Sequence, residues 1–233
     1  MSGFIADSLK DAIREPKYKK YQQKITCSKY PKQGIRMVHL RACAKQLAQE
    51  IQLSDLIGYK PSFLEELTTL GLIIAYYPAD DIREKFEAID YFISINDNWS
   101  TSDTIISTIK DRSDYYFEYL MEMMKENGWR GRFAITSLLW LFLDKEHIHT
   151  IFDGLYSVSY GDYYVDMAVS WLLSKAYEEF KDEVEEVFEN APLNKFVLKT
   201  TFVKIRDIVG ISQQEKDRME EILKDVLCKK GMF

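Results

Sequence analysis

The sequence is poor in glycine, proline, cysteine and histidine, and each shortage argues against a class of protein. Its 233 residues include only 10 Gly and 5 Pro, which leaves little room for the turns of a β-rich fold. The cysteines, Cys27, Cys43 and Cys228, are odd in number and form no CxxC pair, so we expect reduced thiols instead of a disulfide framework. His147 and His149 form only a weak metal-binding pattern, which the end of a surface helix explains better. We expect neither a metal nor an organic cofactor.

Long apolar runs and a targeting segment are also missing. The longest apolar stretches, Leu70–Tyr77 and Leu138–Leu143, are too short to span a membrane. No N-terminal stretch has the basic, apolar and small-residue order of a signal peptide. We therefore expect a cytoplasmic protein that does not contact a membrane, and we expect a monomer.

Charge is unevenly distributed. The net charge is −6, yet residues 1–50 carry 11 Lys and Arg against four acids, a balance of +7, and the remaining 183 residues carry −13. A basic N-terminal lobe is compatible with local phosphate binding. The acidic remainder argues against a strong nonspecific grip on nucleic acid along the whole molecule.

Apolar residues recur at helical spacing along nearly the whole chain, and no period-two pattern indicates a strand. We expect helices over residues 38–51, 63–74, 82–93, 116–123, 134–143, 148–156, 164–177, 184–188, 196–205 and 219–227. Between Ser62 and Ser212 they group into antiparallel pairs of roughly 35–45 residues, the length of HEAT-type units. The sequence therefore predicts an all-α, HEAT-like solenoid with a concave, DNA-facing surface, and an irregular helical bundle is the alternative. We expect one domain over residues 1–233, with a basic lobe (1–50) and acidic helical repeats (51–233).

Four residues call for an explanation beyond packing: Trp99, Asp103, Arg132 and Trp171. Ser100–Asp103 also matches a helix-capping box, which would give Asp103 a purely structural role. Trp99 could staple a helix start or line a cleft. A solvated arginine and a core tryptophan are the plain interpretations of Arg132 and Trp171.

Two further tracts are rich in cations. One interleaves them with aromatic residues, and the other places them on a predicted helix. Lys17–Lys24 alternates lysines with tyrosines, which suits phosphate contact or base stacking but also a solvated helix face. In the stretch 195–206, Lys195, Lys199, Lys204 and Arg206 form either a phosphate-binding face or a plain exposed one.

Four segments in chain order resemble those of the AlkD-like family of DNA alkylation repair glycosylases. They are Gly34–Arg41, Asn98–Asp103, Trp129–Ile135 and Tyr164–Trp171. The first departs from the family at Val38, where proline is usual. Each motif alone is weak, but four in order on a helical repeat chain are much more specific.

The resemblance implies an enzyme that hydrolyses the N-glycosidic bond of cationic N3- or N7-alkylated purines in duplex DNA. By this resemblance Asp103 is the catalytic anion, Trp99 and Trp171 are aromatic walls, and Arg132 holds a phosphate. DNA-binding roles are expected for Arg36, Arg41, Lys195, Lys199, Lys204, Arg206, Tyr163 and Tyr164. The alternative is a catalytically silent repeat scaffold that binds nucleic acid or protein, and the acidic body favours it.

Overall fold

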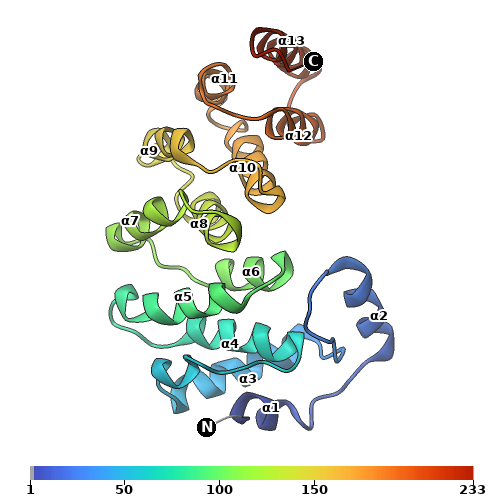
Figure 1. The fold of residues 1–233 in the computed structure, drawn as a ribbon, viewed down its shortest axis with the longest axis vertical. Coiled ribbons are helices and arrows are strands. Elements are labelled where there is room, and N and C mark those ends of the chain that lie inside the picture. Colours follow the sequence, from blue (N-terminus) through green and yellow to red (C-terminus); the bar gives the residue numbers. More distant parts are fainter. Residues whose placement is uncertain (1–2, 233) are drawn as a thin grey trace. The chain divides into compact units, whose positions relative to one another are not determined.

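The structure, a computed structural model, describes residues 3–232 and is built from helices (Figure 1). The α-helices of these residues are α1 (Phe4–Leu9), α2 (Pro16–Ile25), α3 (Met37–Glu50), α4 (Leu64–Tyr76), α5 (Phe86–Ile95), α6 (Trp99–Ile106), α7 (Asp114–Met123), α8 (Gly128–Leu141), α9 (Ile148–Gly154), α10 (Tyr163–Ala176), α11 (Lys181–Asn190), α12 (Lys195–Arg206) and α13 (Gln213–Lys229). Three short 3₁₀ helices are η1 (Leu53–Leu56), η2 (Ile82–Lys85) and η3 (Leu155–Ser157). A lone antiparallel bridge joins Arg14 to Ile35. The predicted all-α helical-repeat fold is confirmed.

The chain divides into two compact units, unit 1 up to Tyr116 and unit 2 from Phe117. In unit 1, α4 is the central helix, and every residue from Leu64 to Ile74 is buried because α3, α5, α6 and α1 all pack on it. In unit 2, α10 takes the equivalent place between α8 and α12, with α9 and α11 in a second layer (Figure 1). The predicted single domain and its concave DNA-facing surface stay predictions.

Successive helical pairs follow one another closely along the chain. Their second helices start at Leu64, Trp99, Gly128, Tyr163 and Lys195, which are 35, 29, 35 and 32 residues apart. Two of these spacings equal the lower limit of the expected 35–45 residues, and the other two are shorter. Connections are short: only residues 96–98 separate α5 from α6, and only residues 191–194 separate α11 from α12.

A buried carboxylate on α4 organises the segment between α2 and α3. The Glu65 side chain accepts hydrogen bonds from the backbone N–H groups of Gln33 (3.0 Å) and Gly34 (2.8 Å). Gly34 has a φ of 82°, and a Cβ atom there would lie 2.6 Å from the carbonyl oxygen of Glu15. Glycine is thus required by both conformation and space, and α4 fixes how the N-terminal helices attach.

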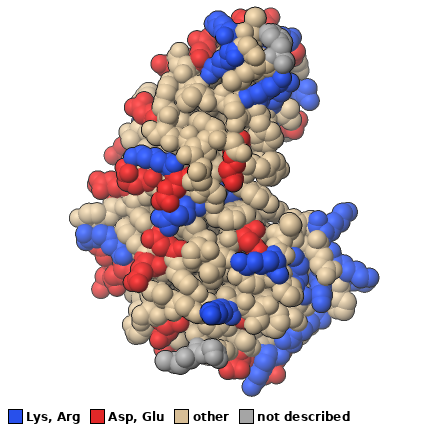
Figure 2. All heavy atoms as spheres, in the orientation of Figure 1, with Lys and Arg blue, Asp and Glu red and all other residues tan. Residues whose placement is uncertain are grey.

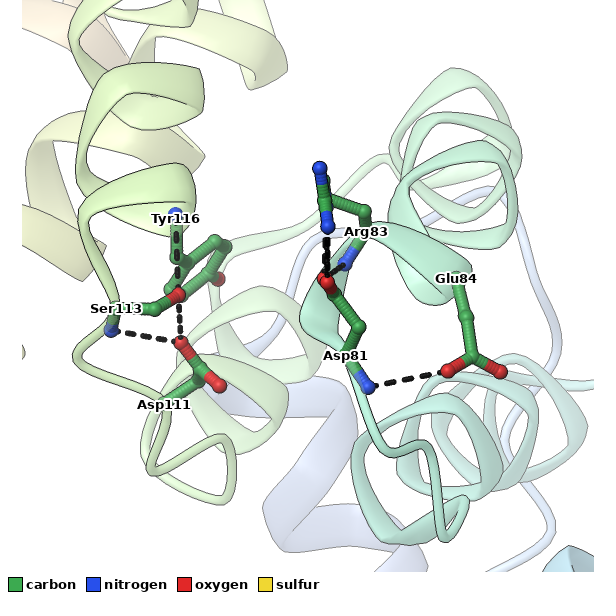
Figure 3. A network of polar contacts seen from close by, with 6 residues as sticks. All are labelled: Asp81, Arg83, Glu84, Asp111, Ser113 and Tyr116. Carbon is green, nitrogen blue, oxygen red and sulfur yellow. Dashed lines mark hydrogen bonds and ion pairs between the residues drawn. The ribbon is translucent and has the colours of Figure 1, made fainter.

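In unit 1, side-chain carboxylates accept hydrogen bonds from backbone N–H groups at the start of η2 and just before α7 (Figure 3). At η2, the Asp81 carboxylate accepts from the Arg83 N–H (2.8 Å), and the Glu84 carboxylate accepts from the Asp81 N–H (3.1 Å), which forms a capping box. Before α7, the Asp111 carboxylate accepts from the backbone N–H of Ser113 (2.9 Å). These bonds satisfy backbone donors that no helix could satisfy.

None of the helices in residues 3–232 combines the length and the apolar character that crossing a bilayer requires.

Candidate functional site

Trp99 and Asp103 lie on α6, one helical turn apart. Trp99 is the first residue of the helix and Asp103 the fifth. Residues four apart project from the same helix face, so the indole and the carboxylate are neighbours on one side of α6. Trp99 is 37% exposed, so part of this residue is accessible to a ligand.

The capping-box interpretation of Asp103 is wrong. The residue that caps α6 is Asn98, whose side-chain oxygen accepts from the Thr101 N–H at 2.9 Å. Asparagine is as good an N-cap as serine, so the helix starts two residues earlier than a cap at Ser100 would allow. Asp103 consequently lies in the second turn, and capping does not account for its carboxylate.

The turn before α6 is held by a segment distant in sequence. The Asp97 carboxylate accepts from the Ser28 hydroxyl (2.7 Å) and from the Lys29 N–H (2.6 Å). The Tyr30 hydroxyl donates to the Ile95 carbonyl at 3.1 Å. Residues 28–30 therefore fix the position of Trp99, a role that the local sequence does not reveal.

Close packing of α6 on α4 sets the position of the rest of α6. A Cβ atom placed on Gly71 of α4 would lie 1.9 Å from Cδ1 of Ile105 and 3.1 Å from Cε2 of Phe92. The absence of a side chain at Gly71 thus lets the two helices approach. Asp103 is two residues from Ile105, so its position depends on this contact.

Arg132 is in the second turn of α8 and is only 6% exposed, so the interpretation as a solvated arginine is wrong. Its Nη1 donates to the Tyr164 carbonyl at 3.4 Å, and the guanidinium carbon is 6.0 Å from the centre of the Tyr164 ring. The indole of Trp129 lies 4.5 Å from that same ring. Because a buried guanidinium keeps its charge, this end of α8 carries a fixed cation.

Trp171 is half-buried on α10, so it is not the core tryptophan that the pattern favours. Its ring is 5.8 Å from that of Trp140 on α8, at an interplanar angle of 89°. Trp140 is 54% exposed. An open cavity of about 360 Å³ lies beside Trp171, and Lys175 and Lys204 are among its lining residues.

The family model described as DNA alkylation repair enzyme matches residues 7–200. The chain belongs to this family. No curated protein and no solved structure matches the chain. Membership gives this repair protein a role in DNA alkylation repair, with DNA as its substrate.

The match to the repair family includes Trp99, Asp103, Arg132 and Trp171. Trp99 and Asp103 belong to unit 1, whereas Arg132 and Trp171 belong to unit 2. Their convergence on one cleft therefore stays a prediction. The departure of this member from the family pattern at Val38 is harmless locally. Val38 is the second residue of α3, where an amide has no partner within the helix and proline and valine are both tolerated.

Two arginines of the repair protein that we expected at the DNA are engaged with other side chains. Arg36 forms an ion pair with Glu15 (2.7 Å) and lies 4.5 Å from the centre of the Tyr18 ring. The hydrogen bond from Arg36 lowers the pKa of the Glu15 carboxyl. Arg41 donates to the Tyr76 hydroxyl (2.8 Å) and to Oγ1 of Thr108 (3.1 Å). A phosphate would have to compete with these partners, most of all at Arg41, which is partly buried.

The cations of α12 are all at least partly accessible. Lys199 and Arg206 are exposed, while Lys195 and Lys204 are intermediate. Lys195 and Lys199 lie within the range that matches the family, which ends at residue 200, and Lys204 lies beyond it.

Aromatic residues near Tyr163 and Tyr164 escaped the sequence analysis. Trp129, Tyr163 and Phe196 are the first or second residues of α8, α10 and α12. An aromatic residue at the start of α8, α10 and α12 was the available signal, and it becomes visible only when the helix starts are known.

No group of three or more His, Cys, Asp and Glu side chains that could hold a metal ion occurs in residues 3–232. Nδ1 of His147 lies 2.8 Å from the Asp144 carboxylate, just before α9. The helix-end interpretation of this histidine fits the structure.

Proposed function

We propose that this protein releases cationic N3- or N7-alkylated purines from duplex DNA by hydrolysing their N-glycosidic bond. The observation that carries the proposal is Asp103, a carboxylate in the second turn of α6 whose presence capping does not explain. Trp99 lies one turn away on the same face, and the family repairs alkylated DNA.

The chemistry needs a fixed negative charge next to the sugar. As the glycosidic bond breaks, its electron pair goes to the purine, which becomes neutral, and the positive charge moves to the sugar as an oxocarbenium ion. Asp103 stabilises this cation and orients the water that bonds to C1′, and the proton of that water goes to the carboxylate or to solvent. A preorganised charge of this kind is the largest single contribution in many enzymes.

The remaining roles follow the electrostatics of the site. The faces of Trp99 and Trp171 attract the cationic base or sugar, a contribution of about 1–2 kcal/mol when water is excluded. Arg132 binds the flanking phosphate by charge-assisted hydrogen bonds. These roles require that the two units bring the four residues together when DNA is bound.

Release of free base from a duplex that contains one N7-alkylguanine or N3-alkyladenine tests the proposal. We expect free base and an abasic strand, measured by chromatography and by alkaline cleavage. A duplex whose purine carries the alkyl group on an exocyclic oxygen is the matched control. That base is neutral and a poorer leaving group, so it should stay in place.

The competing function is a silent scaffold. Unit 2 has 15 basic and 21 acidic residues, a balance of −6, whereas unit 1 has 16 of each. An acidic unit 2 favours weak DNA affinity. A folded wild-type protein that binds alkylated duplex but releases no base would support the scaffold instead.

DNA binding should weaken strongly as the salt concentration rises. We expect the lysines of α2 to contribute most of this salt dependence. This helix carries Lys17, Lys19, Lys20 and Lys24 and no acid, and all four are exposed. Lysine and arginine gather on this side of unit 1 (Figure 2). If all four contact phosphates, replacing them with glutamine should reduce the slope of log K against log salt by about 3–4.

The matched control replaces as many lysines at the other end of the chain, Lys216, Lys224, Lys229 and Lys230, in or next to α13. Affinities are measured by anisotropy between about 50 and 200 mM salt. An equal effect of both sets would mean that only net charge matters, and α2 would then have no special role.

A further inference from the structure

Four aromatic rings form a continuous row across the starts of α8, α10 and α12, all within unit 2. The ring of Trp129 lies 4.5 Å from that of Tyr164, the Tyr163 and Tyr164 rings are 5.2 Å apart, and Tyr163 lies 5.7 Å from Phe196. We call these four residues the ring row.

The helix starts that carry the ring row are fastened to one another by buried polar groups. The Asp166 carboxylate, buried on α10, accepts from Nδ2 of Asn194 (2.7 Å) and from the Gly161 N–H (3.1 Å). Asn194 in turn caps α12, since its Oδ1 accepts from the Val197 N–H at 2.9 Å. On the other side, Arg132 donates to the Tyr164 carbonyl. Little conformational freedom is therefore left to lose when a ligand binds the row.

The row exposes aromatic surface beside positive charge. Tyr163 is 58% and Phe196 40% exposed, and Lys195 and Lys199 flank Phe196 on α12. The nearest carboxylate along the chain, Asp162, is occupied as the cap of α10, where it accepts from the Tyr164 N–H at 2.8 Å. Exposed rings interleaved with lysines are the combination by which proteins hold a strand whose bases are free to stack.

We propose that the ring row is a stacking platform for unpaired bases of the substrate DNA. Bases inside a duplex already have both faces covered by their neighbours, whereas an unpaired base offers a free face to Tyr163 or Phe196. Lys195 and Lys199 then contact the phosphates of the same strand. The protein accordingly prefers alkylated DNA next to a gap or a single-stranded tail. This inference goes beyond base release and depends only on DNA being the substrate.

A tailed duplex and a blunt duplex with the same number of phosphates test the proposal. The tail carries 2-aminopurine, whose fluorescence falls when the base stacks. We expect wild type to bind the tailed DNA roughly tenfold more tightly than the blunt DNA and to quench the probe. Replacing Tyr163 and Phe196 together with alanine should remove most of this preference and the quenching.

Conservative variants distinguish a contribution of aromatic stacking from a contribution of apolar side-chain volume. Tyr163→Phe keeps a ring face and should keep the preference, whereas Phe196→Leu keeps apolar volume without an aromatic face and should lose part of it. Tyr156→Ala removes another exposed tyrosine of unit 2, in η3, and should change nothing. Thermal melting by circular dichroism verifies that each variant is folded.

Equal binding of tailed and blunt DNA by wild type would overturn the proposal, as would an alanine double variant that keeps the tail preference. In the first case the exposed rings would have to be covered by something other than unpaired DNA. Neither outcome concerns base release, which is measured separately on the blunt alkylated duplex. Failure of the stacking platform and failure of the proposed function are thus distinguishable.

Discussion

Asp103→Asn is expected to lower the rate of base release from alkylated duplex DNA by about 10²–10³-fold, the usual effect of losing one preorganised electrostatic partner. The amide has nearly the same shape as the carboxylate but no charge, so the developing sugar cation loses its stabilising anion. Aspartate and asparagine rank together in helix propensity, and Asn98 continues to cap α6. Single-turnover release of base, with enzyme in excess, measures the chemical step directly.

The matched control is Asp225→Asn, an exposed aspartate of α13 outside the range that matches the family. It changes net charge by the same amount, so any general effect on DNA affinity appears in both variants. When the protein concentration saturates the DNA, a difference in DNA affinity no longer affects the measured rate. If wild type releases base and Asp103→Asn releases it equally fast, the enzyme stands and the proposed role of Asp103 is wrong.

Gly71→Ala is expected to destabilise the protein and to impair base release as well. Elsewhere in a helix this change stabilises by roughly 0.5–1 kcal/mol. Here the new methyl group would meet Cδ1 of Ile105 at 1.9 Å, and overpacking of this kind costs about 1–3 kcal/mol. Relief requires a shift of α6 and hence of Trp99 and Asp103. Misplacement of a reacting group by about 1 Å can cost 10²-fold in rate.

Denaturant titration and base-release assays measure the two effects of Gly71→Ala. Gly154→Ala is the control, because its methyl group would meet only the ends of the Met121 and Met124 side chains, which are flexible. Adding Ile105→Ala to Gly71→Ala should cost less than the sum of the two single changes. A Gly71→Ala protein that is as stable as wild type would show that α4 and α6 can separate without strain.

Much of the fold could be predicted, because most of the helices bury an apolar face that recurs at helical spacing. The apolar period over residues 38–51 predicted α3, and that over residues 63–74 predicted α4. Isolated short helices were harder to predict from the sequence. The six residues of α1 are too few for a period to show, and the Lys17–Lys24 tract of α2 left a phosphate-binding segment open beside the favoured solvated helix face.

The candidate site was predicted less well, because its details depend on tertiary contacts. Ser100 and Asp103 have the right spacing for a capping box, yet the turn anchored by Asp97 places Asn98 at the helix start instead. Arg132 follows a polar stretch that suggests solvent, but the packing of α8 against α10 buries it. The order of the motifs along the chain identified Asp103 and Arg132 as candidates. Their burial and hydrogen-bond partners depend on tertiary contacts, which local sequence patterns do not reveal.

The bond between Glu65 and Gly34 has a consequence for synthesis of the chain. Glu65 follows Gly34 by 31 residues, and a ribosome adds roughly 5–20 residues per second. For about 2–6 s, therefore, the lysine-rich N-terminal segment has been made while the carboxylate that anchors it has not. The most basic segment of this protein is therefore synthesised before α4 and is fixed in place only after α4 has followed it out of the ribosome.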